Sequence, residues 1–187
     1  MSESLAVFLR GINVGGIQIR MEALRAAFTY LGFSRVQTIL ASGNVIATPP
    51  PGSADLPALK AVIERELGER FHYDAHVLLR TPAAIDAVLR AAEALTVAND
   101  AHLYVLLCDD PALPGELQAL YETLPHLPGE QFWQAAGEAL WSVPKGSTLG
   151  SDFGNKVLGS KKYKPRLTSR NVQTIEKVHN LLSLGQP

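Results

Sequence analysis

The sequence of 187 residues has a single cysteine, Cys108, and no long apolar run. One cysteine cannot form an intramolecular disulfide. The longest apolar run, Leu103 to Cys108, is far shorter than the roughly 20 residues that cross a bilayer. A basic start of the kind that opens a secretory signal is also missing, because Glu3 occupies that region and Arg10 interrupts the apolar residues after it. We therefore expect a cytoplasmic protein without a membrane segment.

Recognisable catalytic and metal-binding patterns are missing too. The histidines have no ligand spacing, such as two histidines one helical turn apart beside an acid, and His72 and His76 are interpreted as surface residues. Two aspartates follow Cys108, and their charges oppose formation of a thiolate. Ser42 lacks the G-x-S-x-G pattern of a nucleophile elbow. We expect no metal and no cofactor, and the sequence leaves open whether the chain is an enzyme.

The small net charge of −1 hides an uneven distribution of charge along the chain. Residues 145–177 contain eight basic and two acidic side chains, so that this segment carries +6 and the remainder carries −7. Such asymmetry can mark a face that binds anions. A solvated surface that keeps the protein soluble is the alternative interpretation.

The first 80 residues predict the element order β-α-β-β-α-β. The strands are predicted at 5–9, 36–40, 45–47 and 75–79. The first helix ends at Gly32, which suits a left-handed C′ position, and Asp55 caps the second helix with Pro57 in its first turn. This order is typical of a ferredoxin-like lobe, in which two helices cover one face of a four-stranded antiparallel sheet.

The second half predicts a related α/β lobe and a C-terminal helix. Thr81 caps a helix that precedes a strand at 102–108; then follow a helix opened by Pro114 and a hairpin of strands at 131–135 and 138–143. A polar loop leads to a final helix, which Thr168 is expected to cap. We predict an α+β protein with lobes at 1–80 and 81–187, or one compact domain that contains both.

The predicted final helix is one candidate anion site. A cap at Thr168 would put Arg170 in the first turn, where free backbone N–H groups and the helix dipole favour an anion. At about 100° per residue, Thr174 and Lys177 would then lie on the same side as Arg170, and Asn171 lies beside it in the sequence. The alternative is a simple cap with charged side chains in water.

The loop from Arg10 to Gly16 is the second candidate. It has the G-x-x-x-x-G outline of a phosphate loop, but Ile17-Gln18 stands where that motif requires Lys followed by Ser or Thr. Backbone N–H groups around Asn13, Gly15 and Gly16 can still surround an anion. A tight crossover packed on the neighbouring strand explains the glycines equally well.

Trp133 and Trp141 lie on the two strands of one predicted hairpin. They form either a stacking surface for nucleic-acid bases or part of the core.

Three motifs together resemble a known bacterial family. They are Arg-Gly-Ile-Asn-Val-Gly-Gly at 10–16, Ser-Gly-Asn at 42–44, and Thr-Ser-Arg-Asn at 168–171 followed by Thr174 and Lys177. In combination they resemble the family catalogued as a domain of unknown function, number 1697 (DUF1697), over nearly the whole chain. The resemblance implies the fold but no settled activity. Ala41 and Val172 depart from the family pattern, which tends to have Gln and Trp there.

We therefore hypothesise a binding module for an anionic ligand, either nucleic acid or a phosphate-bearing metabolite. Its site would combine the Arg10–Gly16 loop, the turn with Ser42 and Asn44, and the start of the last helix. We expect the loop and the turn to lie at opposite ends of the first lobe, which gives precedence to the residues Arg10, Asn13, Arg170, Asn171 and Lys177. A small hydrolase or transferase acting on a phosphorylated or carboxylated metabolite, and a protein-interaction module, are the alternatives. The oligomeric state stays open.

Overall fold

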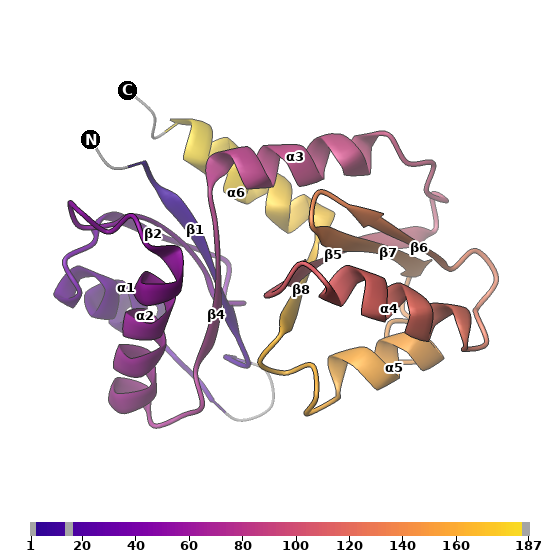
Figure 1. Cartoon of the computed structure of the whole chain (residues 1–187), viewed down its shortest axis with the longest axis horizontal. Helices are drawn as coiled ribbons and strands as arrows, with labels where there is room; N and C mark the ends of the chain where they lie inside the picture. Colours follow the sequence, from indigo (N-terminus) through magenta and orange to yellow (C-terminus); the bar gives the residue numbers. More distant parts are fainter. Residues whose placement is uncertain (1–2, 14–16, 185–187) are drawn as a thin grey trace. The chain divides into compact units, whose positions relative to one another are not determined.

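The computed structural model describes residues 3–13 and 17–184. The chain divides into two compact units, of which unit 1 contains Met1–Ile85 with Lys177–Pro187 and unit 2 contains Asp86–Glu176 (Figure 1). The division into lobes at 1–80 and 81–187 as independent domains stays a prediction. Within the described ranges, every helix is too short or too polar to cross a bilayer.

Unit 1 contains the predicted ferredoxin-like arrangement. Its elements are β1 (Leu5–Arg10), α1 (Met21–Tyr30), β2 (Ser34–Ile39), β3 (Asn44–Thr48), α2 (Leu56–Phe71) and β4 (His76–Arg80). The strand order is β2-β3-β1-β4, and all neighbours are antiparallel. Figure 1 shows α1 and α2 together on one side of this sheet. The prediction for the first lobe is thus confirmed.

Local signals in the sequence account for the ends of these helices. Gly32 has a φ of +83° and its N–H donates to the carbonyl oxygen of Thr29, while the N–H of Phe33 donates to that of Phe28. These two bonds form a Schellman motif, and the rings of Phe28 and Phe33 meet edge to face at 5.2 Å. At the start of α2, Asp55 Oδ1 accepts a hydrogen bond from the N–H of Ala58 at 3.3 Å.

Both faces of the unit 1 sheet are apolar. The face under the helices belongs to a core that includes Val7, Leu9 and Val77. Residues that alternate with these point to the other face, where Phe8 and Leu78 are at most 2% exposed. Charged and polar side chains are therefore confined to the ends and edges of the strands.

Unit 2 repeats the same order of elements. They are β5 (Ala101–Cys108), α4 (Leu113–Glu122), β6 (Gln131–Ala135), β7 (Glu138–Pro144), α5 (Asp152–Leu158) and β8 (Leu167–Asn171). The strand order β6-β7-β5-β8 matches that of unit 1, again with antiparallel neighbours. One further helix follows each set, α3 (Pro82–Glu93) after β4 and α6 (Val172–Leu184) after β8. The related second lobe is confirmed, and it includes a helix and a strand that sequence reasoning missed.

The predicted helix cap at Thr168 is wrong. Thr168 is paired with Leu107, and Arg170 with Val105, in the ladder of β8 and β5. α6 begins only at Val172, and Asn171 caps it, because Asn171 Oδ1 accepts from the N–H of Gln173 at 2.9 Å. Threonine suits a strand as well as a cap, so the local pattern could not separate the two. Arg170 is therefore not in a helical first turn, and its predicted row with Thr174 and Lys177 is wrong.

The missed helix α5 begins with its own cap. Ser151 Oγ accepts a hydrogen bond from the N–H of Gly154 at 3.0 Å. A Cβ at Gly154 would collide with the carbonyl oxygen of Thr148 and with the ring of Trp141. This glycine therefore serves close packing inside a helix, whereas its neighbourhood of small residues had predicted a loop.

The two tryptophans face opposite sides of the unit 2 sheet. Trp141 is paired with Phe132, and Trp133 with Leu140, which is the neighbour of Trp141 on β7. Neighbours along a strand point to opposite faces. Trp141 is fully buried and donates from Nε1 to Glu130 Oε1 at 2.8 Å. The shared stacking surface is thus excluded, and Trp141 is a core residue.

Candidate functional site

Three loops of unit 1 meet at one end of its sheet. Phe8 is paired with Asn44, and Arg10 with His76, so that the end of β1, the turn between β2 and β3, and the start of β4 share this end. We call it the Arg10 end and define it as residues 10–13, 17–20, 40–44 and 72–76.

The expectation that the first loop and the hairpin turn lie at opposite ends is therefore wrong. β3 is antiparallel to both β1 and β2, so β1 and β2 run in the same direction. α1 carries the chain back along the sheet, and the turn after β2 returns to the place where β1 ended. Ser42 and Asn44 belong with Arg10 and Asn13.

Asn13 ties the first loop to the hairpin. Its Nδ2 donates to the carbonyl oxygens of Ala41 at 2.6 Å and Ile19 at 3.3 Å, and its Oδ1 accepts from the N–H of Ile19 at 3.0 Å. The N–H of Asn13 also donates to the carbonyl oxygen of Ile17 at 2.6 Å. These bonds engage the whole side-chain amide, so Asn13 connects residues 17–19 and the hairpin turn to the end of β1. Gly15 and Gly16 lie outside the described residues.

The Ser42-Gly43-Asn44 motif closes the turn against β1. Gly43 has a φ of +76°, and a Cβ there would lie 2.9 Å from side-chain atoms of both Ile12 and Leu9. Its carbonyl oxygen accepts from the N–H of Leu9 at 2.7 Å. Asn44 is buried and donates to the carbonyl oxygen of Ile39 at 2.8 Å and to Ser42 Oγ at 3.0 Å. The close approach of the turn to β1 thus explains why residue 43 is a glycine. The hydrogen bonds that close the turn explain why residue 44 is an asparagine.

Backbone strain concentrates at the Arg10 end. Five described residues other than glycine have positive φ, and three of them are here: Asn13, Leu40 and His72. Asparagine tolerates this conformation, but leucine does not, and Leu40 is also 50% exposed. Such residues cost about 1–3 kcal/mol each and cluster at ligand-binding sites.

Arg10 and His76 are the chemically versatile side chains at this end. As directly opposite partners on β1 and β4 they point to the same face of the sheet, away from α1 and α2. Arg10 is half-buried, and this burial lowers its pKa. His76 Nε2 lies 3.0 Å from Asp74 Oδ2. Sequence reasoning missed His76, although the strand order of a ferredoxin-like lobe would have placed the start of the fourth strand beside the end of the first.

The predicted residues from the C-terminal motif belong to β8 and α6. Arg170 is only 8% exposed, and its Nη1 donates to Thr168 Oγ1 and to the carbonyl oxygen of Ser169, both at 2.8 Å. Asn171 caps α6, as described above. Thr174 and Lys177 lie on α6 and are half-buried and exposed, respectively.

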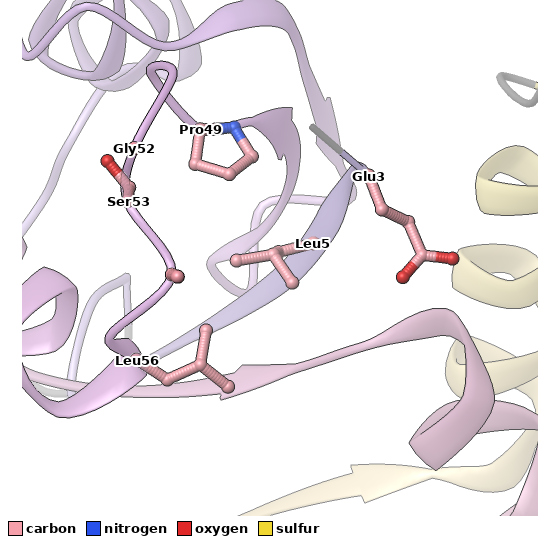
Figure 2. A pocket seen from close by; sticks show the side chains of 7 residues that line it. Glu3, Leu5, Pro49, Gly52, Ser53 and Leu56 are labelled. Carbon is pink, nitrogen blue, oxygen red and sulfur yellow. The ribbon is translucent and has the colours of Figure 1, made fainter. Parts of the chain in front are cut away.

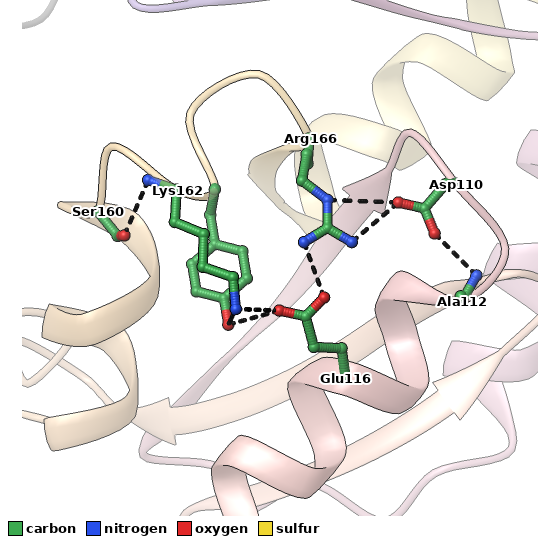
Figure 3. Close-up of polar contacts among 7 residues, drawn as sticks. Asp110, Ala112, Glu116, Ser160, Lys162 and Arg166 are labelled. Atoms are coloured by element: carbon green, nitrogen blue, oxygen red, sulfur yellow. Dashed lines mark hydrogen bonds and ion pairs between the residues drawn. The ribbon is translucent and has the colours of Figure 1, made fainter.

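The basic segment contributes two of its cations to an ion-pair network in unit 2 (Figure 3). Lys162 Nζ lies 2.5 Å from Glu116 Oε1, and Arg166 contacts Glu116 Oε2 at 2.7 Å and Asp110 Oδ2 at 3.0 Å. Tyr163 donates from its hydroxyl to Glu116 at 3.1 Å. The hydrogen bonds from Lys162 and Arg166 lower the pKa of Glu116 to about 2. We call these five residues the Glu116 cluster, and its carboxylates offset both cations.

Two grooves lie at the other end of the unit 1 sheet. One, of about 260 Å³, is bordered by Glu3, Leu5, Pro49 and Leu56 (Figure 2), and one of about 240 Å³ is bordered by Phe33 and Pro50 among others. Their walls are mainly apolar, and none of the predicted site residues lines either groove. In the described part of the chain, no three His, Cys, Asp or Glu side chains group as metal ligands.

The strand orders and helices define an α+β protein of two ferredoxin-like units. Residues 2–141 match the family described as "Protein of unknown function (DUF1697)", and the chain belongs to this family. The match confirms the resemblance; the motif at 168–171 lies beyond the matched residues.

A solved structure has the same fold. The conserved bacterial protein SP0830 from Streptococcus pneumoniae superposes with a TM-score of 0.75 at 21% sequence identity, over 98% of this chain and 99% of that one. No curated protein matches the chain.

Proposed function

We propose that this protein binds a small anionic ligand at the Arg10 end of unit 1. The observation that carries the proposal is the register of β1 and β4, which makes Arg10 and His76 direct partners on one face of the sheet. Arginine offers a planar fork of donors that suits phosphate and carboxylate oxygens. Half-burial strengthens its interaction with an anion, because less water screens the charge.

The described residues around Arg10 support the proposal because hydrogen bonds hold them in place before any ligand arrives. Asn13 joins the first loop to the carbonyl oxygen of Ala41, and Asn44 joins the two sides of the turn. A site held in its binding conformation loses less entropy on binding. The strained backbone at Leu40 and His72 supports the same assignment.

The observations favour a small anion over nucleic acid. Ferredoxin-like domains that bind single-stranded RNA stack bases on exposed aromatic residues of the open sheet face. In this protein that face is buried in each unit, since Phe8 and Leu140 are both 0% exposed. The Glu116 cluster also takes up two cations of the basic segment. A phosphorylated or carboxylated metabolite fits this arrangement better than a polynucleotide.

A binding experiment with inorganic phosphate tests the proposal. We expect phosphate to shift the amide resonances of the Arg10 end, and Arg10→Gln to weaken binding about tenfold or more, as for loss of a charge-assisted bidentate contact. Arg25→Gln is a matched control, because Arg25 is an arginine of the same unit that donates to Thr38 Oγ1. Absence of shifts with phosphate would overturn the proposal. Tight binding of a single-stranded oligonucleotide with steep salt dependence would favour nucleic acid instead.

A further inference from the structure

The strand β6 forms a sheet edge that differs from the other sheet edges of the described residues. The edge strands are β2 and β4 in unit 1, and β6 and β8 in unit 2. Three of them include an arginine: Arg35 in β2, Arg80 in β4 and Arg170 in β8. β6 has the sequence Gln-Phe-Trp-Gln-Ala at 131–135, without charge or proline. Because such residues keep edge strands from pairing with other chains, β6 lacks a protection that the other edges have.

The backbone of β6 is also regular. Its residues pair with β7 without a shift of register. The register of β2, in contrast, shifts between Ser34 and Gln37, where Arg35 has a φ of +52°. Bulges of this kind bend an edge strand and so oppose pairing with another chain. Gln131 and Gln134 of β6 are exposed, so this regular edge is open to solvent.

The turn after β6 determines which backbone groups of the strand point outward. Ala136 and Gly137 have φ of +53° and +81°, as in a type I′ turn, and Ala135 and Glu138 flank the turn as a pair. The flanking residues of such a two-residue turn form a hydrogen-bonded pair, and hydrogen-bonded and non-hydrogen-bonded pairs alternate along an antiparallel ladder. Every second residue of β6, counted back from Ala135, therefore bonds to β7.

Phe132 and Gln134 occupy the positions between these residues, so their backbone N–H and C=O groups point away from β7. No strand within residues 3–13 or 17–184 pairs with this side of β6, which is the end strand of its sheet. We infer that the β6 edge pairs with the β6 edge of a second copy of this chain, in an antiparallel arrangement centred on Trp133. This inference is independent of the anion site proposed above.

A two-fold axis at Trp133 makes the strand complementary to itself. Phe132 of each copy then lies opposite Gln134 of the other, and the two exchange their outward backbone hydrogen bonds. The two Trp133 residues face each other as a non-hydrogen-bonded pair, in which side chains lie closer together and aromatic pairs stabilise the sheet. Trp133 is only half-buried in the single chain, so part of its ring is available for this contact.

Other symmetric registers fit the strand less well. An axis at Phe132 would pair Gln134 with Glu130, whose N–H already donates within the loop before β6. An axis at Gln134 would pair Phe132 with Ala136, which belongs to the turn. Only the axis at Trp133 keeps both hydrogen-bonded partners inside the strand.

The distribution of charge favours a second copy as the partner. A charged residue at the centre of a symmetric pair would lie opposite its own copy, where like charges repel, and β6 has none. On the face covered by α4, Gln118 accepts a hydrogen bond from Gln134 Nε2, and Gly115 lies beside the same side chain. Both helix residues are uncharged. Two copies can therefore approach at this edge without repulsion at its centre.

Mass and hydrogen exchange measured on the wild-type chain test the inference without any substitution. As the concentration rises from micromolar to millimolar, we expect the mass in sedimentation to increase from 20.2 kDa toward twice that value. The amide hydrogens of Phe132 and Gln134 should exchange about tenfold more slowly at the high concentration. Those of Trp133 and Ala135, which bond to β7 in either state, should change less. A mass of 20.2 kDa at millimolar concentration would overturn the inference.

Two lysine variants compare the two outer edges. Trp133→Lys places two lysines opposite each other in the pair, and it should weaken self-association about tenfold or more. Gln37→Lys is the matched control, because Gln37 is an exposed residue of the edge strand β2. It should associate like the wild type. Self-association that is unchanged in Trp133→Lys, or weakened equally in both variants, would place the contact elsewhere and overturn the inference.

Cysteine variants test the register and do not depend on the affinity of Trp133→Lys. In Trp133→Cys, the two introduced cysteines form a non-hydrogen-bonded pair with Cα atoms about 4.5 Å apart, within reach of a disulfide. In Gln131→Cys they lie four residues apart along the ladder, about 13 Å, and cannot join. Mild oxidation should yield covalent dimers of Trp133→Cys only. Equal cross-linking of both variants, or of neither, contradicts the register. A chain that stays monomeric but binds an extended peptide of another sequence at β6 overturns the choice of partner.

Discussion

The two units place different chemistry at the same point of the same fold. In unit 2, the end of β5 and the loop before β8 meet in the Glu116 cluster, where Glu116 lies between Lys162 and Arg166. The corresponding elements of unit 1 contribute Arg10 and His76. Glu116 is the fourth residue of α4, whereas the fourth residue of α1 is the fully buried Leu24.

In unit 2 the charged groups have a structural role. Unit 2 supplies both the cations and the carboxylate that they bind, and the network ties the loop before β8 to α4. In unit 1 the position of Glu116 is occupied by the apolar Leu24, so the carboxylate of this network has no counterpart there. The same fold thus carries different polar groups at this point in its two copies, in line with function residing in sites rather than in folds.

The largest effect is expected from Gly154→Ala in unit 2. The added Cβ would collide with the Thr148 carbonyl oxygen and the Trp141 ring, so that α5 must move away from the sheet. Overpacking costs about 1–3 kcal/mol and more where backbone is involved, so we expect at least about 3 kcal/mol of destabilisation. Urea unfolding followed by tryptophan fluorescence measures it. A wild-type midpoint would contradict the packing described for α5.

A pair of glycine variants compares the two hairpin turns. Gly43 and Gly137 have φ of +76° and +81°, but an added Cβ meets Ile12 and Leu9 only at Gly43, and nothing within 4 Å at Gly137. Gly137→Ala should cost about 1–2 kcal/mol for the left-handed backbone alone. Gly43→Ala should cost about 1–3 kcal/mol more for overpacking. Equal losses in denaturant unfolding would mean that the turn does not pack on β1.

Substitution of Asn13 tests whether its amide holds the site. Asn13→Gly tolerates the φ of 55° and removes the bonds to Ile19 and Ala41. The side chain makes three such bonds, and at about 1 kcal/mol for each we expect a loss of about 3 kcal/mol in the free energy of unfolding. Phosphate affinity should fall as well, because Asn13 no longer connects the end of β1 to Ala41. Unchanged affinity in a phosphate titration that follows the amide resonances would show that the loop does not form the site.

The smallest effect belongs to the Glu116 cluster. The pKa of Glu116 is lowered from 4.5 to about 2, so its charged form stabilises the fold above its ordinary range, and this contribution disappears as the pH falls from about 5 toward 2. The groups are partly exposed, and solvent screening reduces the effect, so Glu116→Gln should cost about 1 kcal/mol at pH 7. Unfolding curves at pH 7 and pH 2 measure it. A difference that persists at pH 2 would point to packing rather than charge.

Local signals made the first lobe predictable from the sequence. Each local signal specifies the structure beside it: the end of a helix at Gly32, the start of a helix at Asp55, and strands where apolar and polar residues alternate. These local preferences are all compatible with one fold. In unit 2, Thr168 suits a cap and a strand equally, and only its pairing with Leu107 decides between them. The helix around Gly154 was missed because packing against the Trp141 ring, which is distant in the sequence, requires this glycine.

The site was harder to predict than the fold because it depends on contacts between distant segments. Arg10, Asn13, Ser42 and Asn44 could be named from their motifs, but their meeting at one end follows from the direction of β2. Arg170 was expected in the first turn of a helix, and only its pairing with Val105 shows that it belongs to a strand. His76 belongs to no motif, and only the register of β4 brings it to Arg10.

The most direct test maps phosphate binding onto both units in one spectrum. The account predicts amide shifts at the Arg10 end, in 10–13, 17–20, 40–44 and 72–76. It predicts none in 109–116 or 160–166, where the Glu116 cluster already supplies its own carboxylate. Shifts centred on the Glu116 cluster, or a spectrum unchanged by phosphate, would contradict it.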